Sequence, residues 1–270
     1  MKDLSKIEQK QLRHLLQEKK ERMLRWEEGD GEFDGVESAP NDLLRESLIH
    51  QAAPSFEQLV IVQALSPPAL SLANIDRGLI IAQIEDVEPL ICLTKLDLVT
   101  ARAEADKIAR IYRELGYHVL LTSALTGEGM SSLRERLENK HSVLLGEAGA
   151  GRKSLLRRLD AGFESKCKTR ELTLEAHNGA ALQCFVKHHD LGRGLEITFL
   201  DGLSVAGFLN VKREEARLYY DEFRDFTDDC ESAECLHTQE KGCAVKQAVA
   251  RGEVAKLRYK SYSEIIQALA

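Results

Sequence analysis

The stretch that decides the fold is LLGEAGAGRKSLL, residues 144–156, in which an apolar run leads into a glycine-rich turn and then into a helical pattern. It resembles the phosphate-binding pattern G-x-x-x-x-G-K-[ST], whose backbone N–H groups surround phosphate. The residues of the turn that we assign to phosphate binding are Gly146, Gly149, Gly151, Arg152, Lys153 and Ser154. Arg152 stands at the lysine position and Lys153 at the position of the metal-binding hydroxyl. The alternative is an ordinary glycine-rich turn between a strand and a helix.

Apolar runs and amphipathic segments alternate on both sides of this turn, which predicts an α/β fold with a parallel sheet and helices on both faces. The expected strands are 58–65, 89–98, 118–125 and 141–151, and the expected helices are 74–85, 101–115, 129–139 and 152–160. Two more strands, 180–188 and 196–203, follow a polar stretch at 164–178. Ligands of such sheets bind where loops leave the carboxyl ends of the strands.

Two of those loops carry elements typical of guanine recognition. TKLDL, residues 94–98, matches the pattern [NT]-K-x-D, in which the aspartate accepts two hydrogen bonds from the base and the lysine stem packs along it. TSAL, residues 122–125, follows the next strand and matches an S-A element whose backbone approaches the guanine oxygen. The predicted base-reading residues are Thr94, Lys95, Asp97, Ser123 and Ala124. TKLDL alone is also compatible with an ordinary surface loop.

A cysteine and histidine cluster near the C-terminus predicts a metal site. Cys230, Cys235, His237 and Cys243 form the spacing C-x4-C-x-H-x5-C. Three thiolates and one imidazole suit a closed, tetrahedral, structural zinc site, which leaves no open position for catalysis. The alternative is a set of unrelated buried thiols with a surface histidine.

Composition restricts the class of protein. The chain has 270 residues, 43% of them hydrophobic, and a net charge of -7, which argues against a chain that coats nucleic acid throughout. We expect a cytoplasmic monomer with no membrane segment, since no apolar run reaches about 20 residues. The expected regions are a basic helix (3–26) with an acidic linker in 1–56, a nucleotide-binding domain at 57–211 and a helical zinc domain at 212–270.

The order of the motifs is permuted, because TKLDL and TSAL precede the phosphate-binding turn. With this order the chain resembles the circularly permuted ribosome small-subunit biogenesis GTPases of the RsgA family, also called YjeQ or EngC. The resemblance extends over NIDRGLIIAQIEDVEPLICLTKLDL, YRELGYHVLLTSALTGEG and the cysteine region. It implies a P-loop GTPase-like fold with GTP or GDP as ligand, structural zinc, and the small ribosomal subunit or its RNA as partner.

The chain also departs from the family pattern. Residues 1–56 lack the five strand patterns of the N-terminal OB-fold that the family has. The switch segment offers only Thr173 as a magnesium-facing residue, and the D-x-P-G element becomes DGLS, with Asp201 kept and Ser204 in place of glycine. Asp201 and Thr173 are the candidate catalytic residues, and the need for magnesium stays open.

Three functions remain compatible with these departures. The first is a GTPase with slow or partner-stimulated hydrolysis, acting in small-subunit assembly. The second is a pseudo-GTPase that binds nucleotide and docks to RNA or protein without turnover. In the third, the site stays empty. For the first two, we expect the Lys153 ammonium to stand where the magnesium ion would be.

Overall fold

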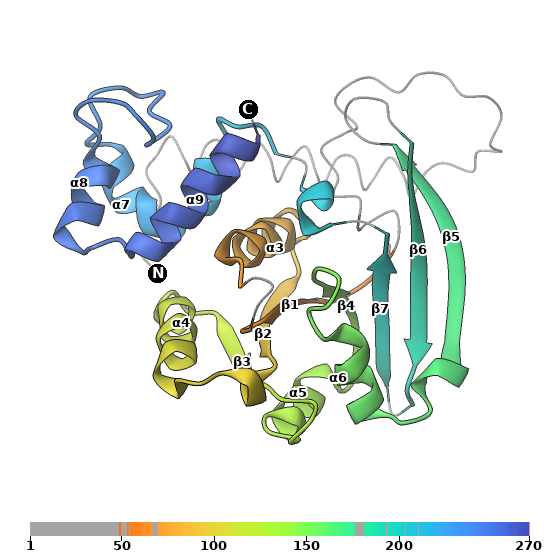
Figure 1. Cartoon of the computed structure of the whole chain (residues 1–270). Coiled ribbons are helices and arrows are strands. Elements are labelled where there is room, and N and C mark those ends of the chain that lie inside the picture. The colour runs from red at the N-terminus through yellow and green to blue at the C-terminus, as the bar shows by residue number, and fades with distance from the viewer. Residues whose placement is uncertain are drawn as a thin grey trace, which may run out of the picture. The chain divides into compact units, whose positions relative to one another are not determined.

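The chain folds around one seven-stranded mixed sheet (Figure 1). The structure is a computed structural model, and it describes residues 49, 53, 55–66, 70–175, 181–192, 194–202, 204–209 and 211–269. The helix predicted at 3–26 and most of the predicted linker lie outside the described residues. In the described part of the chain, no helix has the length and apolar character needed to cross a bilayer.

The sheet has the strand order β3-β2-β1-β4-β7-β6-β5. β1, β2, β3, β4 and β7 run parallel, whereas β6 is antiparallel to β7 and β5 is antiparallel to β6. The strands are β1 (Gln58–Ala64), β2 (Glu88–Thr94), β3 (His118–Leu121), β4 (Lys140–Leu145), β5 (Cys167–Glu175), β6 (Ala181–Asp190) and β7 (Leu195–Asp201). The predicted α/β fold is confirmed, with two antiparallel strands added to its parallel part.

Helices cover both faces of the parallel part, as predicted. α5 and α6 pack on the face that holds Val60, Leu144 and Phe199. On the other face, α3 approaches β1 so closely that a Cβ at Gly78 would lie 2.7 Å from Cγ1 of Ile61. The helices are α3 (Leu72–Glu85), α4 (Arg102–Glu114), α5 (Met130–Leu137) and α6 (Arg152–Leu159), in good agreement with the expected ranges.

The polar stretch at 164–178 contains a strand that the sequence did not reveal. β5 pairs with β6 along its whole length, from Cys167 opposite His189 to Glu175 opposite Ala181. β5 is the edge strand, and its described side chains from Lys168 to Glu171 are all exposed. An edge strand that is solvent-exposed on both faces has no alternation of apolar and polar residues, so the usual sequence pattern of a strand is missing.

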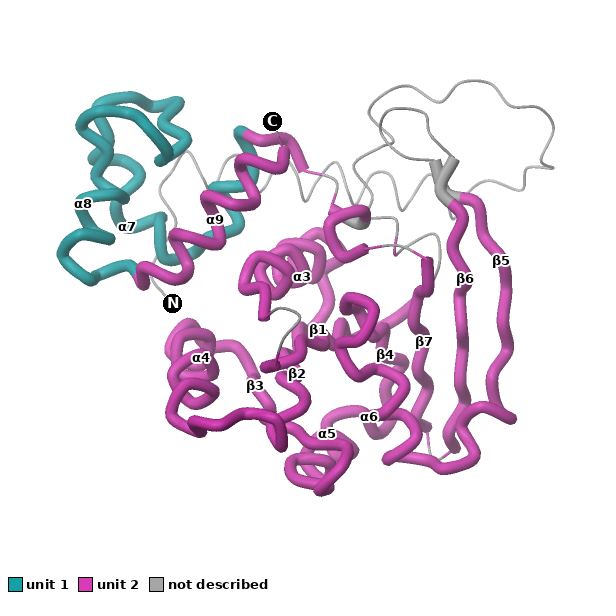
Figure 2. Tube along the Cα trace, viewed as in Figure 1, with its two compact units in different colours: residues 1–43, 214–254 teal, residues 44–213, 255–270 magenta. Residues whose placement is uncertain are grey.

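The chain divides into two compact units (Figure 2). The described part of the first unit comprises residues 214–254, with α7 (Arg224–Thr227) and α8 (Ala244–Arg251). The second unit holds the sheet and also residues 255–270, because α9 (Lys256–Ala268) packs with α3. The unit boundaries therefore differ from the predicted region 212–270: the last helix belongs with the sheet.

Candidate nucleotide site and metal centre

The glycine-rich turn lies between β4 and α6, at the carboxyl end of a central parallel strand. A Cβ at Gly146 would lie 2.4 Å from the carbonyl oxygen of Val62 on β1, so only glycine fits there. Gly149 and Gly151 have φ angles of +80° and +99°, a backbone conformation that other residues rarely adopt. At Gly149 an added Cβ would meet no atom within 4 Å, so the turn is open there. Glycine at these positions therefore permits a backbone conformation of the turn that other residues would strain or block.

Thr94 joins the TKLDL element to this turn. Its buried hydroxyl donates a 2.5 Å hydrogen bond to the carbonyl oxygen of Ala150. An added Cβ at Gly151 would lie 3.2 Å from the same hydroxyl oxygen. The end of β2 and the phosphate-binding turn are therefore packed against each other, as a single nucleotide site requires.

The two predicted base-reading elements also meet. The Ser123 hydroxyl donates a 2.5 Å hydrogen bond to the exposed carboxylate of Asp97, and the same hydroxyl oxygen accepts from the N–H of Thr126 at 3.1 Å. Lys95, with φ of +58°, turns the chain sharply between Thr94 and Asp97. Ala124 follows Ser123 and is half-buried. These contacts hold the Asp97 carboxylate beside the S-A turn.

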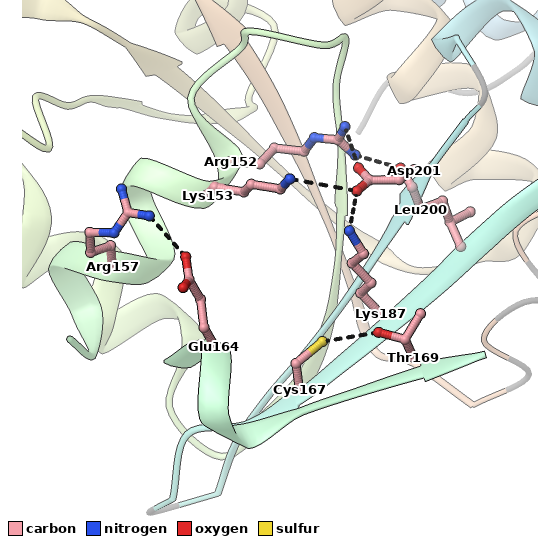
Figure 3. A network of polar contacts seen from close by, with 9 residues as sticks. All are labelled: Arg152, Lys153, Arg157, Glu164, Cys167, Thr169, Lys187, Leu200 and Asp201. Atoms are coloured by element: carbon pink, nitrogen blue, oxygen red, sulfur yellow. Dashed lines mark hydrogen bonds and ion pairs between the residues drawn. The ribbon is translucent and has the colours of Figure 1, made fainter. Parts of the chain in front are cut away.

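Arg152 points toward Asp201 and Leu200 at the end of β7 (Figure 3). Its guanidinium donates to the carbonyl oxygen of Leu200 at 2.7 Å and to Asp201 at 3.3 Å, and it lies over the Phe199 ring. The side chain is only 11% exposed. Burial lowers the pKa of Arg152, an effect that the nearby Asp201 and Glu147 carboxylates oppose. Arg152, which stands at the lysine position of the phosphate-binding pattern, is thus bonded to the end of β7.

Asp201 is surrounded by positive charge. Besides the contact of Arg152 with Oδ1, the Asp201 carboxylate accepts a 2.6 Å hydrogen bond at Oδ2 from Lys187 of β6, and the Lys153 ammonium lies 3.9 Å from the same Oδ2 (Figure 3). Burial favours a higher pKa for Asp201, but the Lys187 hydrogen bond and the three cations outweigh it and hold the pKa below its ordinary value. Lys187 is not among the predicted site residues, because it lies on a strand and belongs to no motif.

Two further contacts shape the phosphate end of the site. The Glu147 carboxylate, inside the turn, accepts from the backbone N–H of Val205 at 2.9 Å and from the Asn74 amide at 3.4 Å. Ser204, which replaces the glycine of D-x-P-G, caps the short helix Val205–Phe208 by accepting from the N–H of Gly207. The segment after Asp201 is therefore tied to the turn by an acidic side chain.

The two candidate catalytic residues, Thr173 and Asp201, do not lie next to each other. Thr173 lies on β5 opposite Gln183, whereas Asp201 on β7 is opposite Phe185, on the other side of β6. Two strand spacings separate β5 from β7, about 10 Å. Ser154 lies on α6 with an exposed side chain, one position beyond Lys153. Neither residue shares the described polar contacts of Asp201.

The residues at the phosphate end do not fit a magnesium ion. The position that supplies the metal-binding hydroxyl in the phosphate-binding pattern is Lys153, and both carboxylate oxygens of Asp201 already face cations. A hard divalent cation needs oxygen ligands and is repelled by adjacent ammonium groups.

Cys230, Cys235, His237 and Cys243 come together in the unit that contains residues 214–254. Their ligand atoms all lie within 4.8 Å of one another. His237 adopts a φ of +55°, which turns Nδ1 toward Cys230 and Cys243, with Sγ–Nδ1 distances of 3.6 and 3.5 Å. Arg217 donates to the carbonyl oxygens of Cys235 and Ala233 and supports the loop.

This cluster fits a tetrahedral zinc ion. Bonds of about 2.3 Å to sulfur and about 2.05 Å to nitrogen, at the tetrahedral angle, separate the two ligand atoms by about 3.6 Å. Burial lowers the pKa of His237 to about 4, so the ring is neutral and can act as a ligand near pH 7. Burial raises the pKa of Cys235 to about 12, a cost that a bound cation removes by stabilising the thiolate.

The fold and the loops together define a P-loop GTPase-like protein with a permuted order, in which the base-reading loops precede the phosphate-binding turn. The family model described as RsgA GTPase matches residues 36–192, more than half of the chain. The chain belongs to the RsgA GTPase family.

Similar proteins agree with this assignment. The small ribosomal subunit biogenesis GTPase RsgA of Caldanaerobacter subterraneus subsp. tengcongensis is 31% identical over 83% of this chain and 74% of its own length. The protein of the same name from Bacillus pumilus is 32% identical over 86% of this chain and 76% of its own length.

Two solved structures share the fold. YjeQ from Thermotoga maritima aligns with a TM-score of 0.59 and 27% identity, over 80% of this chain and 72% of that one. YloQ, described as a circularly permuted GTPase, aligns with a TM-score of 0.54 and 27% identity, over 79% of this chain and 68% of that one. The permuted order inferred from the sequence is thus confirmed.

Proposed function

We propose that this chain binds GTP and GDP, hydrolyses GTP slowly or only when a partner stimulates it, and acts in assembly of the small ribosomal subunit. Its relatives are named small ribosomal subunit biogenesis GTPases, which supports the partner and the reaction class. The slow rate of GTP hydrolysis is inferred from the surroundings of Asp201, whose carboxylate is neutralised by Arg152, Lys153 and Lys187.

In this proposal Asp97 reads the base. Its carboxylate is exposed and already oriented by the Ser123 hydroxyl, so it can accept the two guanine N–H groups. The stem of Lys95 packs along the ring, and the backbone at Ser123 and Ala124 approaches the guanine oxygen. The Thr94 hydroxyl acts within the protein, because it is buried and bonded to Ala150.

At the other end of the nucleotide, the backbone of Gly146 to Gly151 holds the phosphates and Lys153 stands in place of a metal ion. The Lys153 side chain is 60% exposed and its ammonium lies at the Asp201 carboxylate, on the side where the helix begins. A lysine in that place lets phosphate bind with little dependence on magnesium. It does not supply the divalent charge that speeds phosphoryl transfer, which is why we expect slow turnover.

A second candidate function is a pseudo-GTPase that docks to RNA or protein without turnover. The position of Arg152 favours it, because its guanidinium is already engaged by Leu200, Asp201 and Phe199, and we expect it not to act on the transferring phosphate. In that case Asp201 and Thr173 have no catalytic role.

Calorimetry and turnover assays separate these functions. Titration of GDP and GTP, each with magnesium and with a chelator, should give dissociation constants that differ little between the two conditions. GTP hydrolysis should then be measured alone and with small ribosomal subunits. Stimulated turnover supports the GTPase, binding without turnover supports the pseudo-GTPase, and strong magnesium dependence with ordinary turnover would overturn the role of Lys153.

We also propose that the Cys230, Cys235, His237 and Cys243 cluster holds one structural zinc ion. The S–N distances and the neutral imidazole support it. Metal analysis of the purified protein should find one zinc per chain, and Cys243→Ser should abolish it. Cys167→Ser, outside the cluster, is the matched control and should leave the zinc content unchanged.

A further inference from the structure

A row of polar side chains crosses the sheet on the face opposite to α5 and α6. Thr198 of β7 pairs with His188 of β6, and His188 pairs with Lys168 of β5, so the three side chains share one face. Val143 of β4 also pairs with Thr198 and shares its face of the sheet. His141 lies two residues before Val143 on the same strand, so its side chain is on this face as well. The core that α5 and α6 cover uses the alternate residues of β7, Ile197 and Phe199.

Hydrogen bonds fix the two histidines. The Thr198 hydroxyl lies 2.9 Å from Nε2 of His141 and 3.0 Å from Nδ1 of His188. Nδ1 of His141 bonds the carbonyl oxygen of Ser55, so this nitrogen carries a hydrogen. When both rings are neutral, Thr198 donates to His141 and accepts from His188. Nε2 of His188 is then the nitrogen without a hydrogen.

These side chains line a hollow that basic residues also line. Its volume is about 240 Å³, and Lys168, Thr169 and Arg170 of β5 line it together with both histidines. The acidic groups that act on His188 are Glu196, whose carboxylate lies 4.0 Å from Nε2, and Asp190. Two permanent cations, together with an imidazole that can take up a proton, are groups that hold an oxyanion.

The hollow is separate from the nucleotide site. His141 is the second residue of β4, whereas the phosphate-binding turn begins at Gly146, after the strand has ended. Five residues of strand span about 16 Å. The two places therefore lie at opposite ends of β4.

We propose that this hollow binds a phosphate oxyanion, held by Lys168 and Arg170, with His188 taking up a proton at Nε2 when the anion enters. The source of the oxyanion is either free inorganic phosphate or the phosphodiester backbone of RNA. The proposal does not depend on nucleotide binding at the other end of β4.

The titration of His188 gives a direct readout. Burial lowers the pKa of His188, and the neighbouring His141 and Lys168 lower it too, while Glu196 and Asp190 act in the opposite direction. The ring of the anion-free protein is therefore neutral at pH 7. A bound oxyanion favours the charged ring, so phosphate should raise the pKa of His188.

NMR of the histidine rings in the full-length protein tests this with inorganic phosphate. In phosphate, compared with chloride at equal ionic strength, the midpoint of His188 should rise by about half a pH unit or more. The double variant Lys168→Gln/Arg170→Gln should remove the rise, and Lys107→Gln, an exposed lysine on α4, should keep it. Saturating GDP should not remove it. A midpoint that does not respond to phosphate, or that responds equally in the double variant, would overturn the proposal.

Anisotropy with a labelled single-stranded RNA decamer distinguishes the sources. If RNA is the source, the double variant should bind about tenfold more weakly, and the slope of log K against log salt should fall by about 0.7 for each lost contact. A His188 response to phosphate without any RNA effect assigns the hollow to free phosphate. Displacement of RNA or phosphate by polyglutamate at equal charge would overturn the proposal in favour of an acidic peptide. Circular dichroism and GDP affinity, unchanged in the double variant, control for folding.

Discussion

Asp201 is the residue on which the nucleotide chemistry depends. In a magnesium-dependent site this carboxylate would act through a metal ion, but here it accepts from Lys187 and faces Arg152 and Lys153. If the carboxylate only neutralises these cations, its removal leaves them free for phosphate. We therefore predict that Asp201→Asn binds GDP in the presence of a chelator at least as tightly as the wild-type protein does.

Calorimetry checks this, with Lys187→Gln as the companion variant. Lys187→Gln removes one cation and should weaken GDP binding about tenfold or less, as expected for a partly exposed charge. If Asp201→Asn instead lost magnesium-dependent affinity that the wild-type protein shows, Asp201 would hold a metal and not only its neighbouring cations.

The same carboxylate predicts a pH dependence of stability. The pKa of Asp201 is lower in the folded chain than its ordinary value of 3.8, so its ionised form stabilises the fold. That contribution is fully present above the ordinary value and is lost as the pH falls through the folded value. The free energy of unfolding in urea should favour wild type over Asp201→Asn at pH 7, by a margin that narrows below about pH 4. A margin that widens on acidification would contradict this.

At the scale of elements, the link between β2 and the phosphate-binding turn rests on one hydroxyl. Thr94→Val keeps the shape of the side chain but leaves the Ala150 carbonyl without its donor. A buried, unpaired acceptor costs about 1–3 kcal/mol. We predict a loss of that size in urea unfolding, together with weaker GDP binding, because the turn loses its support. Thr94→Ser keeps the hydroxyl and should behave like wild type in both measurements.

The last helix is fastened to the sheet unit by a buried ion pair. Asp76 of α3 bonds Arg258 and Ser261 of α9, and it also accepts a 2.9 Å hydrogen bond from Tyr112 of α4. Asp76→Asn removes the carboxylate that faces the buried Arg258 guanidinium, so we predict a loss of about 3–5 kcal/mol in urea unfolding followed by circular dichroism.

The double variant Asp76→Leu/Arg258→Met removes both charges and is the control. It should be clearly more stable than Asp76→Asn, since replacing a whole buried pair by apolar residues is often close to neutral. Equal losses in the two variants would show that packing at these positions, and not the lost ion pair, sets the cost.

The sequence was most informative where an element has one buried face. The four predicted helices and the strands around the glycine-rich turn have apolar side chains in regular positions, and the structure has them at nearly the same residues. β5 was not predicted from the sequence because both of its faces are exposed to solvent. The turn of Arg152 toward Leu200 and the arrival of Lys187 from β6 depend on how β7 and β6 pair. No local pattern encodes such contacts.

At the scale of the whole molecule, the unit with the metal cluster is an insertion. Residues 214–254 leave the sheet unit after the segment that follows β7, and the chain returns to it with α9. The described part of this unit has short helices and a small core, so we expect its fold to depend on a metal ion held by the four ligands. The sheet unit has its own core, and α9 is held there by Arg258 and Asp76.

Zinc removal should therefore unfold one unit and spare the other. With a strong chelator, we predict that amide hydrogen exchange rises throughout 214–254, while α9 and β1 keep their protection. The unfolded insertion acts as a long loop, and loop length changes closure entropy only slowly, by about 0.6 kcal/mol per doubling. Zinc added back should restore protection, and Cys167→Ser should respond to chelator and zinc as wild type does. Loss of protection in α9 together with 214–254 would show that the two units unfold as one.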